Sequence, residues 1–238
     1  IKFKNLGLAI IDEQHKFGVA QRSKLWKKNF FPPHMLIMTA TPIPRTLAMT
    51  AYGDLDISII DELPKGRLEI KTFLKSDSKR LEIFNFIKKQ INEGRQIYIV
   101  YPLIEESKKM DYKDLMDGYE SISREFPLPK YKISILHGKM KYDEKKIEMK
   151  RFIKGETQIM VATTVIEVGV NIPNASVMII ESAEKFGLSQ LHQLRGRVGR
   201  GNFQSYCILV ASEKKSNEAK IRLETMKKSN DGFEIADV

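Results

Sequence analysis

The 238 residues are enough for one large domain or two smaller ones, and a hydrophobic content of 42% supports a packed core. Forty lysines and arginines against thirty aspartates and glutamates give a net charge of +10, which favours a polyanionic partner, nucleic acid first. The single cysteine excludes an internal disulfide, and with four scattered histidines it excludes a zinc cluster. No apolar run approaches the roughly eighteen residues of a membrane span, so the sequence predicts no membrane segment.

A pair of acidic residues follows the first expected strand. Residues 6–11 form a short apolar run that predicts a buried parallel strand, and Asp12, Glu13, Gln14 and His15 come directly after it. Ligands of open α/β sheets bind where strands end, so one carboxylate is a candidate for holding Mg²⁺ and the other for activating water. The alternative is that the two acids only open the helix that follows.

A second expected strand, residues 34–38, runs into a loop that two prolines stiffen. This loop displays Thr39, Thr41 and Arg45 at the same sheet edge as the acidic pair. A rigid loop at this edge can transmit a conformational change from one bound ligand to a second binding site. Plain turn and cap residues are the alternative for the two threonines.

Residues 61–66 combine charge, proline and glycine between two periodic regions, and we expect the domain boundary there. Only two strands precede it, so residues 1–65 are expected to be an incomplete domain. Strand and helix patterns then alternate over residues 66–228 and predict a parallel, doubly wound sheet. The expected strands cover residues 69–74, 96–100, 132–136, 158–162, 177–180 and 205–210, and the main helices cover residues 76–93, 142–154 and 216–228.

The first helix after the boundary has an apolar face in the sequence. Leu81, Phe84 and Ile87 recur at helical spacing, so we expect this stripe to pack on the sheet. Ser76 stands where an N-cap is expected. Residues 105–129 are more polar, and we expect a surface helix followed by a loop there.

Polar residues also follow two later strands. His137 stands at a strand end, where a phosphate contact and an ordinary turn histidine are both reasonable. Thr163 and Thr164 follow another strand, and their loop continues through Gly169 and Asn171. Hydroxyls, a glycine that permits close approach and an amide suit a sugar-phosphate backbone or a nucleotide.

The stretch from 190 to 201 holds three arginines and three glycines. Arg197 and Arg200 stand three residues apart, so a helical turn is expected to point both at one spot. Two rigid guanidinium forks aimed at one place suit a phosphate group. For this spacing alone, a solvated basic helix end is the alternative.

The ordered set of motifs resembles a known group of motor proteins. Four segments resemble, in order and spacing, motifs II, III, V and VI of superfamily 2 helicases: residues 12–15, 39–41, 162–173 and 193–200. Three longer strings resemble the RecG family of branch-migrating DNA helicases in particular: residues 12–19, 39–50 and 61–64. The Mfd family of transcription-repair coupling factors is similar in some of these strings, and the resemblance to RecG covers essentially the whole chain.

This resemblance implies α/β domains of the RecA-like, P-loop NTPase type, one partial and one complete, with ATP between them. It implies that Asp12 holds Mg²⁺, that Glu13 activates water, and that Arg197 and Arg200 act as arginine fingers toward the γ-phosphate. It also implies ATP contacts by Gln193, Gly169 and Asn171. Coupling of the nucleotide state to DNA binding is implied for Gln14, His15, Thr39 and Thr41. DNA contacts are implied for Arg45, His137, Thr163 and Thr164.

The sequence departs from the family pattern at two points. Asn171 stands where the family usually has aspartate, which removes a charge from the expected ribose contact. No G-x-x-x-x-G-K-[ST] loop is present, so residues 1–65 are expected to lack the Walker A half of their domain, and the chain alone is not expected to hydrolyse ATP. Residues 229–238 are expected to begin a truncated C-terminal coupling motif.

The resemblance therefore implies part of an ATP-dependent double-stranded DNA translocase that remodels stalled forks and Holliday junctions in recombination and repair. Its implied cofactors are ATP and Mg²⁺, and its implied partners are branched double-stranded DNA and single-stranded DNA-binding protein. A monomer in the bacterial cytoplasm is expected. Two alternatives stay open: an Mfd-type translocase that displaces RNA polymerase, and a nucleic-acid-binding module whose helicase motifs are vestigial.

Overall fold

The computed structural model describes residues 4–13, 33–39, 56, 58, 60, 66–102, 108–163 and 172–236. The chain divides into two compact units, which we call unit 1 (Ile1–Leu55) and unit 2 (Asp56–Ala236). Of the domain boundary expected at residues 61–66, only Gly66 lies within the described residues, so the boundary stays a prediction.

Unit 1 contains two short parallel strands, β1 (Leu8–Asp12) and β2 (His34–Met38), where the sequence predicts strands. The burial expected for these strands is wrong for most of their described residues, since Leu8, Ile10 and Leu36 are 55%, 58% and 48% exposed. Leu8 lies opposite His34 at one end of the pair, and Asp12 lies opposite Met38 at the other. Because the strands are parallel and in this register, the residues that follow them emerge at the same edge.

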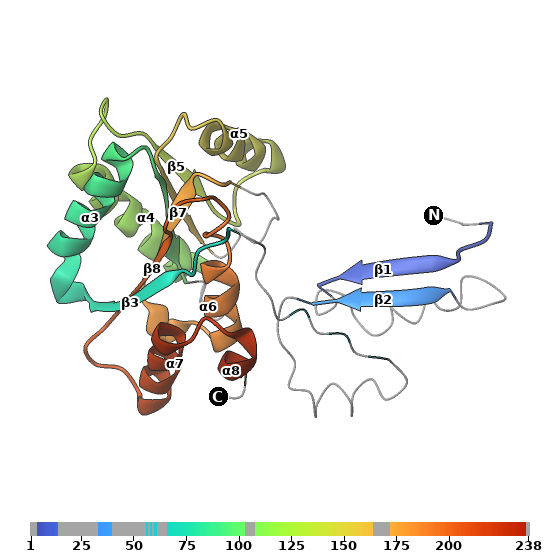
Figure 1. Cartoon of the computed structure of the whole chain (residues 1–238). Coiled ribbons are helices and arrows are strands. Elements are labelled where there is room, and N and C mark those ends of the chain that lie inside the picture. Colours follow the sequence, from blue (N-terminus) through green and yellow to red (C-terminus); the bar gives the residue numbers. More distant parts are fainter. Residues whose placement is uncertain are drawn as a thin grey trace. The chain divides into compact units, whose positions relative to one another are not determined.

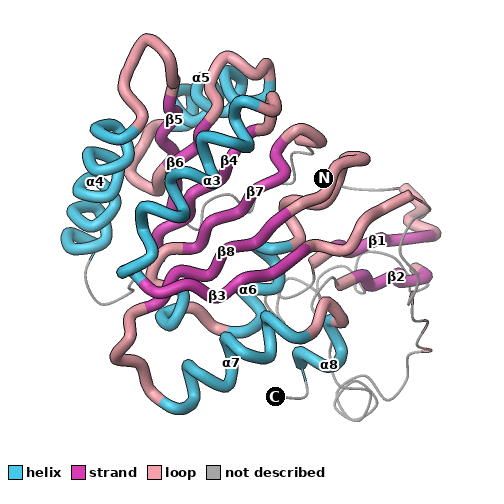
Figure 2. Tube along the Cα trace, turned by 60° about the vertical axis from the view of Figure 1, so that its left-hand side comes forward, coloured by secondary structure: helices cyan, strands magenta, loops and turns pink. Residues whose placement is uncertain are grey.

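Unit 2 is built on a six-stranded sheet in which every neighbouring pair is parallel (Figure 2). This confirms the doubly wound parallel sheet that the sequence predicts. From one edge to the other, the strands are β3 (Lys71–Ser76), β8 (Tyr206–Ala211), β7 (Ala175–Ile180), β4 (Gln96–Tyr101), β6 (Ile159–Thr163) and β5 (Ile133–Leu136).

Helices cover both faces of this sheet (Figure 1). One hydrophobic cluster joins the sheet to α3 (Arg80–Asn92) and α4 (Lys108–Glu125). The opposite cluster joins it to α5 (Tyr142–Ile153), α6 (Leu188–Arg195), α7 (Asn217–Lys228) and α8 (Gly232–Ala236). Successive side chains of a strand point to opposite faces, so Ile97 and Ile99 of β4 join the first cluster while Tyr98 and Val100 join the second.

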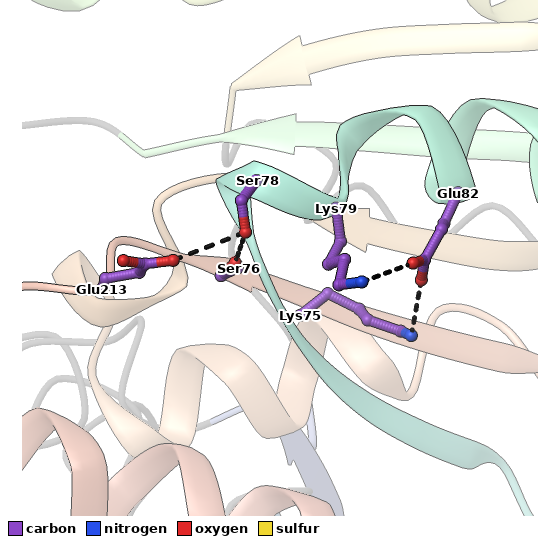
Figure 3. Close-up of polar contacts among 6 residues, drawn as sticks. All are labelled: Lys75, Ser76, Ser78, Lys79, Glu82 and Glu213. Carbon is purple, nitrogen blue, oxygen red and sulfur yellow. Dashed lines mark hydrogen bonds and ion pairs between the residues drawn. The ribbon is translucent and has the colours of Figure 1, made fainter.

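The connection from β3 to α3 is a short 3-10 helix, η2 (Asp77–Lys79), and polar contacts hold it (Figure 3). The Nζ atoms of Lys75 and Lys79 lie 3.2 and 2.8 Å from the carboxylate oxygens of Glu82. Ser76 was predicted to cap the helix, but its hydroxyl bonds to the Ser78 hydroxyl and makes no capping bond to the backbone. The 3-10 turn separates Ser76 from the first turn of α3, which explains why the predicted cap is wrong.

The buried face of α3 also differs from the predicted stripe. Phe84 and Ile87 are buried as expected, but Leu81 is 73% exposed and Ile83 takes its place in the core. Because η2 uses the first residues of the expected helix, Leu81 lies in the first turn of α3, on its solvent side. On α4, Leu115 and Ile122 are fully buried, so this surface helix contributes a row of side chains to the core.

Helices α5 and α7 have the bounds that the sequence predicts to within one residue. Gly155 adopts a φ of +72° just after α5, a backbone conformation that glycine favours. The Ser216 hydroxyl caps α7 by accepting a hydrogen bond from the Ala219 N–H at 3.2 Å. No helix in the described part of the chain is long and apolar enough to cross a membrane.

Candidate functional site

The carboxyl ends of the two strands of unit 1 carry the predicted acidic pair and one predicted threonine. Asp12 ends β1 and is exposed, Glu13 follows it, and Thr39 follows β2. The Glu13 N–H donates to Oδ1 of Asp12 at 2.9 Å, and Glu13 has a φ of 51°. A left-handed backbone at a residue other than glycine costs about 1–3 kcal/mol and is concentrated at functional sites.

The chemistry of Asp12 fits a Mg²⁺ ligand. Mg²⁺ in phosphate-handling sites is held by one or two carboxylates, by substrate phosphates and by waters, so one exposed carboxylate suffices on the protein side. Among the described residues no three His, Cys, Asp or Glu side chains form a group that could hold a metal ion by themselves. The four predicted residues Gln14, His15, Thr41 and Arg45 lie outside the described residues.

The two predicted arginine fingers do not lie on one helical turn, and that expectation is wrong. Helix α6 ends at Arg195, Gly196 is its C-cap, and Gly199 has a φ of +76°. The chain has therefore left the helix before Arg200, since a left-handed residue ends helical geometry. Arg200 turns back instead, and its Nε donates to the Gly196 carbonyl at 3.3 Å.

The two guanidinium groups nevertheless lie close enough for their charges to act on a common neighbour and on each other. Tyr98 is 3% exposed, and burial raises its pKa to about 12, while the positive charges of Arg197 and Arg200 act in the opposite direction. The pKa of Arg200 is lowered by burial first and then by the positive charges of Arg197 and Arg67. The irregular turn of residues 196–201, which we call the arginine turn, therefore places Arg197 and Arg200 within reach of each other's charge, and the charge of Arg67 also acts on Arg200.

Two glycines let this turn pack closely against neighbouring segments. The Gly199 N–H donates to Oγ of Ser205 at 3.1 Å, and a Cβ at Gly199 would lie 2.9 Å from Cγ1 of Ile70. A Cβ at Gly201 would lie 2.5 Å from the Pro173 carbonyl oxygen. Ser205, Ile70 and Pro173 all stand just before a strand begins, so the arginine turn lies at the amino edge of the sheet.

The first arginine of the stretch has a structural position. Arg195 is 2% exposed, and its Nη1 donates to the carbonyls of Met226 at 2.8 Å and Ser229 at 2.7 Å. Its Nη2 lies 3.2 Å from Nδ1 of His192. A cation that binds the last carbonyls of a helix is favoured by the helix dipole, so Arg195 fixes the end of α7 to α6.

The remaining predicted ATP contacts are only partly described. Gln193 lies on α6 and is half-buried, two residues before the end of the helix. Gly169 and Asn171 lie outside the described residues, and their roles stay predictions.

The predicted DNA contacts lie at the opposite, carboxyl edge of the sheet. Thr163 ends β6 and His137 directly follows β5, and these strands are neighbours with Leu136 opposite Ala162. Thr163 is 2% exposed, and its hydroxyl has no hydrogen-bond partner among the described residues. Burial and the charges of nearby lysines lower the pKa of His137, so its imidazole is neutral at neutral pH. Thr164 lies outside the described residues.

A buried ion pair at the same edge was not found from the sequence. Glu181 directly follows β7 and is 4% exposed, and its carboxylate binds the guanidinium of Arg80 at the start of α3. Arg80 also contacts Asp77, with 3.0 Å between Nη2 and Oδ1. Burial raises the pKa of Glu181. The position of Glu181 directly after the fully buried strand β7 is the signal that could have identified it.

Unit 2 therefore carries two candidate functional groups on opposite edges of one sheet. Arg197 and Arg200 are at the amino edge, and Thr163 and His137 are at the carboxyl edge. The amino and carboxyl edges are separated by the length of a strand, which is about 20 Å for the six residues of β4. An anion at one edge and a nucleic-acid backbone at the other could both be bound without steric competition.

Comparison with known proteins gives a consistent set of relatives. Residues 78–202 match the helicase conserved C-terminal domain. The ATP-dependent DNA helicase RecG of Synechocystis sp. is 52% identical over 238 residues, which cover 100% of this chain and 28% of that protein. RecG of Bacillus subtilis is 51% identical over 237 residues, which cover 100% of this chain and 34% of that protein. The chain thus spans about a third of the length of the curated relatives it matches.

Solved structures show the same fold. A structure of RecG bound to a three-way DNA junction superimposes with a TM-score of 0.79 at 43% identity, covering 100% of this chain and 30% of that one. Dbp5 of S. cerevisiae, bound to RNA and ADP BeF3, has a TM-score of 0.62 at 15% identity, covering 94% of this chain and 59% of that one. The second likeness concerns the fold alone, and both identify the six-stranded domain as RecA-like.

Proposed function

We propose, because the chain belongs to the family of helicases with the conserved C-terminal domain, that it is part of an ATP-dependent DNA helicase of the RecG type. The proposed activity of the whole protein is ATP-driven translocation on double-stranded DNA and remodelling of branched DNA such as forks and Holliday junctions. The observation that carries this proposal is that one RecA-like sheet has the arginine turn at the amino ends of its strands and Thr163 and His137 at the carboxyl ends.

The proposed chemistry of ATP hydrolysis divides between the two units. Asp12 would hold Mg²⁺, which neutralises charge on phosphate oxygens when it is bound, and Glu13 would accept a proton from the attacking water. Arg197 and Arg200 would stabilise the negative charge that develops on the transferred phosphoryl group, which is the role of arginine fingers. Gln193, Gly169 and Asn171 would contact the nucleotide beside them.

The carboxyl edge of unit 2 is proposed to hold the DNA backbone. The buried hydroxyl of Thr163 could donate to a phosphate oxygen, as could the neutral imidazole of His137. Thr164 and Arg45 are proposed to extend this contact. Gln14, His15, Thr39 and Thr41 are proposed to link the state of the nucleotide to the grip on DNA.

The proposal is tested with a longer protein that contains these 238 residues and is as long as the relatives. Its rate of ATP hydrolysis is expected to rise when three-way junction DNA is added, and to rise less with linear duplex of equal length. It is also expected to separate the strands of the junction in an ATP-dependent way. An ATPase rate that no DNA changes would contradict the proposal, whereas stimulation only with RNA polymerase present would favour the Mfd-type alternative.

The DNA edge has a separate test. Thr163→Val keeps the shape of the side chain and removes a hydroxyl without a partner in the described part of the chain, so the stability of the chain is expected to be unchanged or higher. Junction binding is expected to weaken about fivefold, the value of one neutral hydrogen bond. Unchanged binding at low salt would remove Thr163 from the proposed DNA contact.

A further inference from the structure

The third arginine near the arginine turn comes from the segment that leads into β3. Arg67 follows Gly66, whose φ of +82° turns the chain into this segment. Three residues later, Ile70 packs so closely on Gly199 that a Cβ there would lie 2.9 Å from Cγ1 of Ile70. The entry to β3 and the arginine turn are therefore in direct contact.

Two hydrogen bonds fix the same segment to the residues just after the turn. The Lys71 N–H donates to the Ser205 carbonyl at 3.0 Å, and Nε2 of Gln204 donates to the Glu69 carbonyl at 2.8 Å. Lys71 is also opposite Tyr206 in the register of β3 with β8. The backbone that carries Arg67 is held against residues 199–206 over several residues, which limits where the Arg67 side chain can reach.

The charges in this region are of one sign. Arg67 and Arg197 both lie close enough to Arg200 for their positive charges to act on it, together with the buried phenol of Tyr98. In the described part of the chain no carboxylate is among the groups that perturb the pKa of Arg200, and no hydrogen bond or ion pair of Arg67 is found there. Three guanidinium groups that repel one another are stabilised when an anion lies between them.

We propose that Arg67 is a third phosphate-binding residue, which together with Arg197 and Arg200 forms a polyphosphate site on unit 2. This inference rests on the proposed function of Arg197 and Arg200 as phosphate ligands and extends it to the segment that enters β3. The ligand is the polyphosphate chain of a nucleoside triphosphate, which offers several oxygens to three rigid forks.

The test measures the affinity of the 238-residue chain for sodium tripolyphosphate, the probe, by calorimetric titration at low salt. Arg67→Gln is expected to weaken binding about tenfold, because one charge-assisted contact is lost. Arg67→Lys keeps the charge and loses the fork, so it is expected to fall between the wild type and Arg67→Gln. Arg124→Gln, at an exposed position on α4, is the matched loss of charge and is expected to change affinity less than twofold, roughly the screened effect of a distant charge. Titration with ATP shows whether the nucleoside adds to the affinity.

Urea unfolding without the probe separates a binding role from a structural one. Loss of Arg67 relieves repulsion, so Arg67→Gln is expected to unfold at the same urea concentration as the wild type or a higher one. A lower midpoint, or wild-type affinity for tripolyphosphate in Arg67→Gln, would overturn the inference. If Arg200→Gln weakens binding while Arg67→Gln does not, only the role of Arg67 fails. If neither variant differs from the wild type, or the wild type binds no tripolyphosphate, the phosphate site itself fails.

Discussion

Replacement of Gly201 by alanine tests whether the arginine turn is held at a fixed place on the sheet. A Cβ at this position would lie 2.5 Å from the Pro173 carbonyl oxygen and 3.3 Å from its carbonyl carbon, and real Cβ atoms essentially never come within 3.0 Å of another heavy atom. The obstacle is backbone just before the fully buried strand β7, so it cannot rotate away as a flexible side chain could.

The expected loss of stability follows from two opposing contributions. Overpacking of this kind costs about 1–3 kcal/mol. Replacing glycine by alanine restricts the unfolded chain and returns about 0.4–1 kcal/mol. We therefore expect Gly201→Ala to lower the free energy of unfolding by about 1–2 kcal/mol.

Urea unfolding followed by far-ultraviolet circular dichroism measures this loss, because the helices in the described residues all belong to unit 2. Gly138→Ala is the matched control, since a Cβ there meets no atom within 4 Å and the residue has no positive φ. The control is expected to be as stable as the wild type or slightly more stable. Equal midpoints for Gly201→Ala and Gly138→Ala would refute the argument that close packing against Pro173 fixes the turn.

Three other predictions concern the buried arginine, one histidine and DNA. Arg195→Met leaves carbonyls at the end of α7 without their donor and is expected to lower the free energy of unfolding in urea by about 3 kcal/mol. The control Arg151→Met removes a surface ion pair and is expected to lower it by less than about 1 kcal/mol. Equal losses in the two variants would contradict the structural role of Arg195. Burial and the charge of Arg195 lower the pKa of His192 below its usual 6.5, so the unfolded state takes up the proton first and stability falls as the pH drops below that value. The urea midpoint is therefore expected to fall less in His192→Gln than in the wild type between about pH 7.5 and about pH 5.5, and equal falls would exclude this role. The chain is expected to bind duplex DNA weakly, with an affinity that drops steeply as salt rises, whereas an affinity independent of salt would exclude phosphate contacts.

Strands buried on both faces were the easiest features to predict. The apolar runs of β4 and β6 have no polar side, which is the pattern of a parallel strand covered by helices on both faces. Their order in the sheet is set by pairing between distant segments, so the sequence predicts that a parallel sheet exists but not that β3 lies at its edge.

Features that depend on irregular backbone or distant contacts were predicted poorly. Spacing suggested that Arg197 and Arg200 share a helical turn, whereas helix α6 ends at Arg195, before either of them, and a left-handed glycine stands between them. The ion pair of Arg80 with Glu181 joins residues 101 positions apart, and periodicity carries no information about such a pair. Arg67 approaches the turn only because β3 pairs with β8.

The phosphate role of the arginine turn is the central claim, and the DNA-stimulated ATPase of an Arg200→Ala variant tests it most directly. The assay uses a protein of the relatives' length that carries this chain, with three-way junction DNA as the activator. We expect the rate of hydrolysis to fall by about 10³-fold or more, the usual effect of losing an arginine finger, while the affinity for the junction stays within about twofold of the wild type. ATP hydrolysis at the wild-type rate in Arg200→Ala would contradict the account.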